Sequence, residues 1–373
     1  MKFLIAHLVI LLLMIACEQP IENSSLSLAE QNSSIIAEVV QQSFIDHNVP
    51  GILLLLKFED GSIFKDAFGY SDLRDSAIIK TSQQFRIGSV TKTMIGTAVL
   101  ILVDRNIIKF ENTLEELLPG VITRGNEITL MMLLNHSSAI PNYTNYDAFL
   151  DIYSTNPTYE WTPKVICDLF RNEELLDTPG EKSYYSNSNY YLLGLIIEKF
   201  SNKPLTDFLR DEIFHPLKMY STYLPETCDL NGNVVRGYLD INNDGIISDN
   251  EDFTSQAPYS IWAAGGVVST IDDLLIWTEE LMAGTLLSSA LQATRNVIDV
   301  PVAEAPIGVN YGLGISDIFG AIGHTGAVAG YSTIIFNYKK TTFIAFGNSY
   351  ETANESGLIA EDLFEKLKNV LFN

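Results

Sequence analysis

The chain has 373 residues, 47% of them hydrophobic, and a formal net charge of −23 from 46 acidic and 23 basic side chains. So apolar a sequence is not a disordered acidic tail, and it is long enough to bury a large core. With few basic residues and no basic run, we expect no nucleic-acid partner, because phosphate binding needs clustered Lys and Arg.

The first seventeen residues have the pattern of an export signal. Lys2 precedes an apolar stretch, residues 3–15, that is too short to stay in a bilayer as a spanning helix. The stretch ends in Ala16-Cys17, which resembles the signal of bacterial lipoproteins, whose cysteine is lipidated. The sequence thus predicts a signal peptide over 1–17, lipidation of Cys17 and a membrane-anchored cell-envelope lipoprotein, with plain secretion as the alternative. Residues 18–32 are expected to form a flexible tether.

The next hundred residues contain clear helix and strand patterns. Apolar spacing predicts a helix over 33–46 and then strands over 51–57 and 62–70, joined by a turn at 59–61. An apolar helix is expected over 92–103. Beyond it, several helical segments alternate with polar loops.

The C-terminal part is expected to return to strands. Its predicted elements are a Gly-Gly turn at 265–266, a helix over 271–282, strands over 331–338 and 341–348, and an amphipathic helix over 355–371. Strands at both ends and helices between them predict an α+β fold, an antiparallel sheet flanked by the N- and C-terminal helices with an inserted, mostly helical lobe. The α/β lobe would comprise 33–88 and 260–373, and the helical lobe 89–259.

A Ser-x-x-Lys spacing occurs twice. Ser62 and Lys65 lie in a predicted strand, where residues three apart point to opposite faces, so this lysine cannot serve this serine. Ser89 and Lys92 begin a predicted helix, where such residues share a face. Ser89 is therefore the candidate nucleophile and Lys92 a candidate base, if burial lowers its pKa. From the spacing alone, Ser89 as an ordinary helix cap is the alternative.

Two further segments join this one to form a known set of motifs. Ser89-Val90-Thr91-Lys92, Tyr185-Ser186-Asn187 and His324-Thr325-Gly326 resemble, in order, the three motifs of the serine β-lactamase and penicillin-binding superfamily. The branch is that of class C β-lactamases and D-alanyl-D-alanine carboxypeptidases, and stretches 133–141 and 265–274 agree with it. A second Tyr-x-Asn copy, residues 143–145, lacks the Pro-Gly lead-in and the following apolar helix, so the Tyr185 copy is preferred.

The resemblance implies roles for the first two motifs. Ser89 would form an acyl-enzyme that water later hydrolyses. Lys92 and Tyr185 would share proton transfer, with the base left open between them. Asn187 would orient Lys92 and the substrate amide.

The third motif is implied to bind substrate through His324, Thr325 and Gly326, with the backbone N–H groups of Ser89 and Ala327 as oxyanion hole. Lysine is the commoner residue at position 324, and an unperturbed histidine is mostly neutral at pH 7. No Lys or Arg lies within residues 296–338. A substrate carboxylate would then need Thr325 or a cation from elsewhere, which keeps esterase and amidase chemistry open.

The resemblance therefore implies a serine hydrolase that cleaves an amide or ester bond, D-alanyl-D-alanine carboxypeptidase-like or D-amino-acid peptidase-like, and the N-terminal signal implies that it is exported. Its substrate would be a small molecule or a peptide, such as a peptidoglycan stem peptide, and catalysis would need no cofactor. A carboxylesterase, a β-lactam sensor that acylates without turnover, and a catalytically silent binding lipoprotein are the alternatives.

Residues 240–251 match an EF-hand loop at every liganding position. The candidate calcium ligands are Asp240, Asn242, Asp244, Ile246 through its carbonyl, Ser248 and Glu251. Because the preceding residues are β-like, an acidic hairpin tip is the alternative. A bound calcium would stabilise the loop and take no part in catalysis.

The two remaining cysteines are Cys167 and Cys228. In an exported protein they could form a disulfide, and the sequence leaves their pairing open. With no Cys/His cluster, we expect no catalytic zinc site of the usual spacing.

Overall fold

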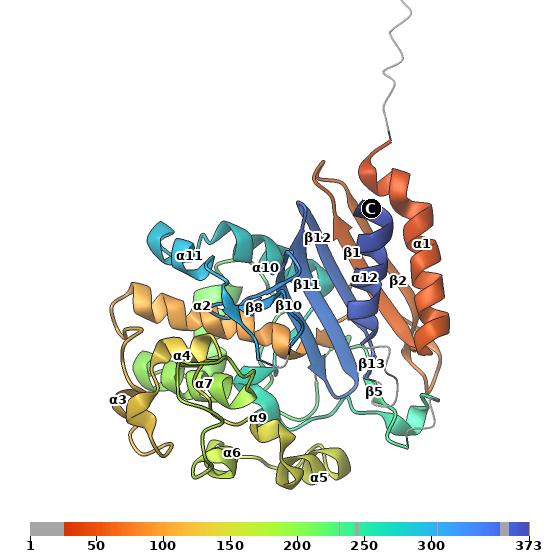
Figure 1. Ribbon diagram of the computed structural model, residues 1–373. Helices are drawn as coiled ribbons and strands as arrows, with labels where there is room; N and C mark the ends of the chain where they lie inside the picture. Colours follow the sequence, from red (N-terminus) through yellow and green to blue (C-terminus); the bar gives the residue numbers. More distant parts are fainter. Residues whose placement is uncertain (1–25, 231, 243–245, 304, 351–357, 373) are drawn as a thin grey trace, which may run out of the picture.

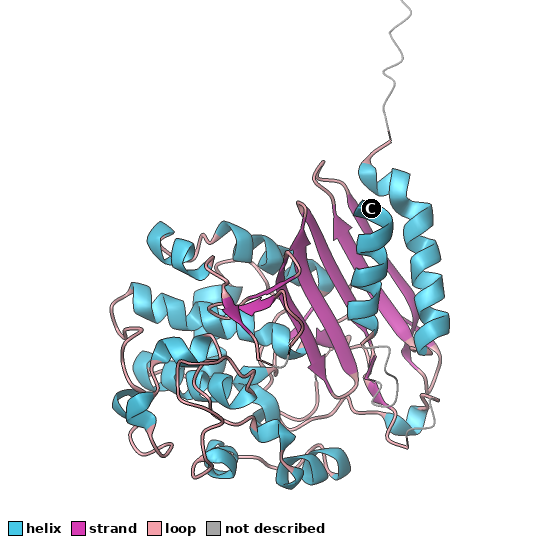
Figure 2. Cartoon of the chain, in the orientation of Figure 1, coloured by secondary structure: helices cyan, strands magenta, loops and turns pink. Residues whose placement is uncertain are grey.

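The computed structural model describes residues 26–230, 232–242, 246–303, 305–350 and 358–372. The predicted signal peptide and Cys17 lie outside these ranges. Within them, a large sheet carries helices on both faces (Figures 1 and 2). A search of these residues finds no helix that is long and apolar enough to cross a membrane.

The central sheet has nine strands in the order β3-β2-β1-β12-β11-β10-β9-β8-β7, and every neighbouring pair is antiparallel. The strands are β1 (Gly51–Lys57), β2 (Ile63–Asp72), β3 (Ala77–Ile78), β7 (Val300–Pro301), β8 (Val309–Tyr311), β9 (Ser316–Ile318), β10 (Ala321–Val328), β11 (Tyr331–Tyr338) and β12 (Thr341–Gly347). Because β1 pairs with β12, the sheet is assembled from both ends of the chain, which confirms the predicted fold class.

Four short strands lie outside this sheet. They are β4 (Phe85–Arg86), paired with β6 (Val268–Ser269), and β5 (Tyr238–Leu239), paired with β13 (Ser349–Tyr350). The periodicity did not predict these strands, β3 or β7 to β9, because two or three residues are too few for a period-two pattern. It also missed the longer β10, whose sequence is interrupted by Gly323 and Gly326.

Strand β1 shows why its sequence is an unbroken apolar run. Ile52, Leu54 and Leu56 pack in the hydrophobic cluster that α1 and α12 share, whereas Leu53 and Leu55 pack in the larger cluster on the opposite face. Successive side chains of a strand point to opposite faces, so a sheet covered on both faces needs apolar residues at every position.

Helices α1 (Leu28–His47) and α12 (Ile359–Phe372) cover the outer face side by side (Figure 1). Asp362 of α12 accepts a hydrogen bond from Ser43 and pairs with His47, which ties the two helices together. α1 begins at Leu28 instead of residue 33, because Ser27 and Glu30 form a capping box. Residues 28–32 therefore belong to the helix and not to the predicted tether. Residues 355–357, predicted as the start of the last helix, lie outside the described ranges.

The inner face packs against helix α2 (Thr91–Asp104), whose residues Thr91 to Leu102 are all buried. Helix α10 (Ile271–Ala283) also contacts the sheet, and the Trp277 indole N–H donates to the Thr93 hydroxyl at 2.7 Å. The remaining α-helices of the described residues are α3 (Leu114–Leu117), α4 (Leu130–Leu134), α5 (Asp147–Thr155), α6 (Pro163–Phe170), α7 (Asn187–Ser201), α8 (Leu205–Leu209), α9 (Pro258–Ile261) and α11 (Ser289–Arg295). Those that Figure 1 labels lie on the same side of the sheet as α2.

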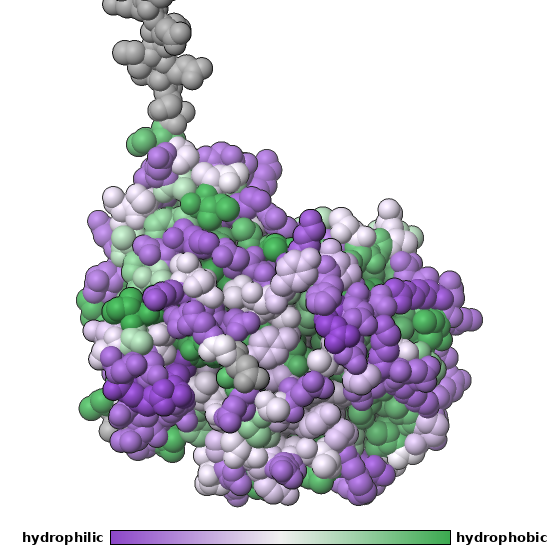
Figure 3. Space-filling model, turned by 180° about the vertical axis from the view of Figure 1, so that it is seen from behind, coloured by the Kyte–Doolittle hydropathy of each residue, from purple (hydrophilic) through white to green (hydrophobic). Residues whose placement is uncertain are grey.

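The surface mixes polar and apolar residues. Figure 3, seen from behind, shows hydrophobic residues dispersed among hydrophilic ones over that face. Large exposed apolar side chains such as Ile45, Ile78 and Tyr220 come from different segments of the chain. Scattered exposure of this kind is normal for a globular surface and does not by itself indicate a binding site.

Candidate active site

Ser89 lies in a single 3-10 turn, Gly88–Val90, that leads directly into α2. Lys92 is in the first turn of α2, and its Nζ is 2.8 Å from Ser89 Oγ. Ser89 is half-buried whereas Lys92 is fully buried. The serine hydroxyl thus sits between an accessible surface and a buried amine.

Two glycines bring this turn against strand β10. A Cβ on Gly88 would lie 2.7 Å from the backbone nitrogen of Ala327, and a Cβ on Gly326 would lie 2.1 Å from the carbonyl oxygen of Ile87. Real Cβ atoms do not approach other atoms so closely, so only glycine fits at either position. The close contact sets the backbone of Ser89 beside that of Ala327, as an oxyanion hole requires.

The Lys92 amine has three hydrogen-bond partners. Besides Ser89 Oγ, they are Asn187 Oδ1 at 2.7 Å and the Ala264 carbonyl oxygen at 2.6 Å. Burial lowers the pKa of Lys92 well below its ordinary value. The two carbonyl oxygens can only accept, so a neutral amine gives them its two hydrogens. Its lone pair then faces the Ser89 hydroxyl, which is the arrangement that a general base needs.

Asn187 is oriented by a segment that the sequence analysis set aside. Its Nδ2 donates to Thr144 Oγ1 at 2.9 Å, and its backbone N–H donates to Asn142 Oδ1 at 3.1 Å. Thr144 belongs to the second Tyr-x-Asn copy, which forms a 3-10 turn, Tyr143–Asn145, in which Tyr143 is buried. This copy therefore supports the first one. The sequence alone did not reveal this supporting role, because residues 143–145 and Asn187 are distant in the chain and meet only in the fold.

Tyr185 lies over the same amine, with Lys92 Nζ 4.9 Å from the centroid of its ring. Burial raises the pKa of the Tyr185 phenol, and the opposing effect of its hydrogen bond with Ser89 is smaller. The phenol is therefore neutral at physiological pH. The ring packs 4.5 Å from the ring of buried His136, whose Nδ1 accepts the backbone N–H of Ser186 at 3.1 Å. His136 thus fixes the segment that carries Tyr185.

The third motif divides between the two faces of β10. Thr325 pairs with Ile334, which packs in the α1–α12 cluster, and the Thr325 hydroxyl hydrogen-bonds Glu361 of α12. The prediction that Thr325 faces the substrate is therefore wrong, because in a strand it points away from its neighbour His324.

His324 does face the catalytic side, with its ring 6.2 Å from that of Tyr185. Its Nε2 is 2.8 Å from the hydroxyl of Tyr311, and its Nδ1 contacts the Thr325 carbonyl oxygen. Burial, together with the nearby Lys92, lowers the pKa of His324 to about 3. The imidazole is thus neutral at physiological pH. Tyr311, which no sequence motif indicated, is its partner.

Two hollows flank these residues. The larger, about 710 Å³, includes Asn187 and Ala327, and the smaller, about 260 Å³, includes Tyr185. Asn145 lines both. The larger is lined mainly by apolar and aromatic residues: Phe149, Leu150, Tyr153, Leu239, Ile261, Val328, Ala329 and Tyr350. The site therefore has room for a bulky apolar group on one side of Ser89.

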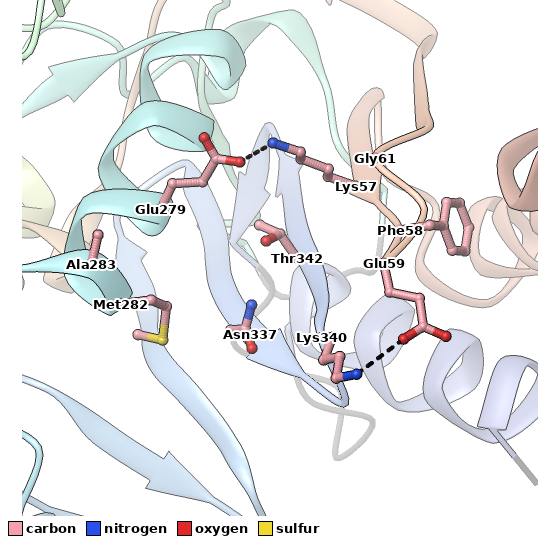
Figure 4. Close-up of a pocket in the computed structure, with 10 residues that line it drawn as sticks. All are labelled: Lys57, Phe58, Glu59, Gly61, Glu279, Met282, Ala283, Asn337, Lys340 and Thr342. Atoms are coloured by element: carbon pink, nitrogen blue, oxygen red, sulfur yellow. Dashed lines mark hydrogen bonds and ion pairs between the residues drawn. The ribbon is translucent and has the colours of Figure 1, made fainter.

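Another hollow, of about 610 Å³, lies away from this site between the β1–β2 turn, the β11–β12 turn and α10 (Figure 4). Its charged side chains pair with one another, Lys57 with Glu279 and Lys340 with Glu59. None of the candidate catalytic residues lines it. We therefore assign it no part in catalysis.

In the first Ser-x-x-Lys copy, the side chains of Ser62 and Lys65 have different partners, as the strand geometry predicts. Lys65 Nζ pairs with Asp272 at 2.8 Å, whereas Ser62 Oγ donates to Asp60 and accepts the backbone N–H of Ala29. Ser62 thus helps to anchor the start of α1, a structural role that the sequence did not reveal.

The predicted calcium loop is only partly described, because residues 243–245 lie outside the described ranges. Glu251 is buried, and its carboxylate accepts hydrogen bonds from the backbone N–H groups of Ile241 and Ser248. A search of the described residues finds no group of three or more His, Cys, Asp or Glu that could hold a metal ion. Calcium binding therefore stays a prediction. Cys167 and Cys228 are both free thiols.

Comparison with known proteins defines the family. The family model described as Beta-lactamase matches residues 34–363, so the chain belongs to this family and is a serine hydrolase. Penicillin-binding protein 4* of Bacillus subtilis (strain 168) is 27% identical over 333 residues, covering 82% of this chain and 70% of that protein. Protein flp of Staphylococcus aureus (strain MW2) is 27% identical over 206 residues, which is only 40% of its length.

Solved structures show the same fold. A D-stereospecific amidohydrolase from Streptomyces sp. has a TM-score of 0.75 at 24% identity, covering 88% of this chain and 97% of that one. D-amino acid amidase from Ochrobactrum anthropi SV3, complexed with D-phenylalanine, also has a TM-score of 0.75 at 24% identity, covering 90% and 99%.

The lowered pKa of Lys92 predicts the pH dependence of Ser89 reactivity. Since the neutral amine is the form that takes a proton, labelling of Ser89 by a fluorophosphonate will speed up with rising pH. The rate will level off well below pH 10.5, the ordinary lysine value. Replacing Lys92 by Met is expected to slow labelling by about 100-fold or more. A rate that still climbs at pH 10.5 would contradict a depressed pKa.

Proposed function

We propose that the protein hydrolyses amide bonds of D-amino-acid derivatives through an acyl-enzyme on Ser89. The observation that carries this proposal is the buried Lys92 amine, whose two carbonyl partners leave its lone pair directed at the serine hydroxyl. Tyr185 and Asn187 complete the constellation, and two hollows beside it offer space for the two halves of a substrate.

In the proposed acylation, Ser89 Oγ attacks the substrate carbonyl carbon while its proton passes to Lys92 Nζ. The backbone N–H groups of Ser89 and Ala327 donate hydrogen bonds to the resulting oxyanion. The intermediate then collapses and the C–N bond breaks. The departing amine takes the proton from the Lys92 ammonium, and the neutral Tyr185 phenol acts as the relay.

Deacylation follows the same path with water in place of the amine. Lys92, again neutral, takes a proton from water as the water oxygen bonds to the acyl carbon. The Ser89 ester bond breaks, and Ser89 Oγ recovers the proton from Lys92. The half-buried position of Ser89 leaves the ester within reach of solvent.

The activities named for similar proteins support the choice of substrate. The structural neighbours include a D-stereospecific amidohydrolase and a D-amino acid amidase, and one relative is a penicillin-binding protein. The apolar, aromatic lining of the larger hollow suits a hydrophobic amino-acid side chain. A carboxylesterase would use the same groups, since only the leaving atom differs.

The enzyme is expected to release ammonia from D-phenylalanine amide, with the L-enantiomer as matched control. Replacing Ser89 by Ala will abolish both turnover and fluorophosphonate labelling, a loss of about 1,000-fold or more in rate. Turnover of phenyl esters without amide turnover would indicate the esterase. Penicillin labelling without any turnover would indicate the sensor, and labelling that persists in Ser89→Ala would refute the nucleophile.

We further propose, from the sequence, that Cys17 is lipidated and anchors the protein to the membrane of the cell envelope. Full-length protein will then incorporate a clickable palmitate in bacterial cells and partition into the detergent phase of Triton X-114. Cys17→Ala will do neither. Equal partitioning of both proteins into the aqueous phase would leave secretion or retention without a lipid as the explanation.

We also propose that residues 240–251 bind a structural calcium ion, on the strength of the loop's spacing of oxygen ligands. Chelation is then expected to lower the melting temperature, and calcium but not magnesium will restore it. Asp240→Asn, which removes one ligand charge, will weaken the response. A melt that is unchanged by chelation, in protein shown to contain no calcium, would contradict the proposal.

A further inference from the structure

The hollows beside Ser89 offer no cationic side chain to a substrate. Among the described residues that line them, none is Lys, Arg or His, and the single charged residue is Asp151, an exposed carboxylate in the larger hollow. A group entering either hollow therefore meets apolar, aromatic and amide side chains. With a net charge of −23, the chain as a whole also repels anions.

Lys92 cannot supply the missing charge. It is fully buried beneath Ser89, and its amine is shared among three oxygens. A substrate carboxylate that recruited it would have to displace Asn187 or the Ala264 carbonyl. It would also hold the lysine in its protonated form, which is not the form that activates Ser89.

His324 cannot supply the charge either, because both of its ring nitrogens are occupied within the protein. The Thr325 carbonyl oxygen is an acceptor, so Nδ1 carries the hydrogen. Nε2 lies 2.8 Å from the hydroxyl of Tyr311. Both polar atoms of the ring therefore point at protein groups and not at the cleft, and burial keeps the ring neutral at physiological pH.

Thr325 offers no substitute donor, because its hydroxyl lies on the other face of β10 and bonds Glu361. A carboxylate next to the bond that breaks would lose part of its hydration in the cleft without gaining an ion pair. The free-energy cost of desolvating a carboxylate is much larger than that of desolvating a neutral amide or ester group.

We propose that Ser89 acts on acyl compounds that carry no carboxylate beside the scissile bond, and that the pairing of His324 with Tyr311 is the determinant of this selectivity. The leaving group is ammonia, an amine that carries no carboxylate, or an alcohol. This inference rests on the proposed function and narrows it toward amino-acid amides, away from peptides that end in a free carboxylate.

The test compares two D-phenylalanyl thioesters that differ only in the leaving group. One releases thioglycolate, which carries a carboxylate, and the other releases 2-mercaptoethanol, which is neutral. Thiol release is followed by a chromogenic disulfide, and each kcat/KM is divided by the rate of hydroxide-catalysed hydrolysis to remove the intrinsic difference in reactivity. The neutral thioester is expected to be preferred by about tenfold or more.

Two variants locate the selectivity. His324→Lys places an ammonium on the strand and is expected to shift the ratio by about tenfold toward the thioglycolate ester. His324→Gln is the matched control: it stays neutral, keeps a donor and an acceptor, and is expected to retain the preference. Melting temperatures of both variants identify any loss of folding, and the wild-type ratio tests the substrate class independently of either variant.

Equal or greater turnover of the thioglycolate ester by the wild-type enzyme would overturn the inference. Turnover of neither ester by an enzyme that does release ammonia from D-phenylalanine amide would overturn it too. A protein whose Ser89 is not labelled at all would instead refute the proposed function. An unchanged ratio in a folded His324→Lys protein would remove His324 as the determinant.

Discussion

The burial of the Lys92 amine is the constraint on which the rest of the site depends. An amine without contact with solvent is costly to protonate, so the fold must supply hydrogen-bond acceptors for a neutral group. Two segments supply these acceptors, the start of α7 through Asn187 and the backbone carbonyl of Ala264. A third segment, the turn before α2, places the Ser89 hydroxyl at the lone pair of the amine. Each segment is held by different elements, and the pairing of β1 with β12 closes the sheet that supports them.

The sequence was sufficient for most of the long elements, although not for β10, and for distinguishing the two Ser-x-x-Lys copies. Unbroken apolar runs predicted β1, β11 and β12, and the difference between strand and helix geometry separated Ser89 and Lys92 from Ser62 and Lys65. Other features could not be read this way. The acceptor at Ala264 is a backbone carbonyl, which leaves no trace in residue type. Thr144 and Tyr311 act through contacts with residues distant in the chain.

For two of the wrong predictions, the sequence contained the information needed for the correct one. The Ser27–Glu30 capping box sets the start of α1 at Leu28, and the spacing was present in the sequence. Thr325 was treated as a substrate ligand together with His324, although adjacent residues of a strand point to opposite faces. In both cases the family pattern or the composition of the segment was given more weight than local geometry.

The neutral state of His324 and the burial of Lys92 are connected. A permanent cation at position 324 would depress the pKa of a neighbouring lysine by repulsion and would also attract anionic substrates. In this chain burial is the cause of the lowered Lys92 pKa, and His324 is itself held neutral. The pKa of Lys92 is therefore lowered without a cation at position 324. The amine is available as a base, and the site carries no positive charge that would attract an anionic substrate. A site built in this way loses electrostatic affinity for carboxylates and depends on shape and apolar contact for binding. The aromatic lining of the larger hollow is suited to that mode of recognition.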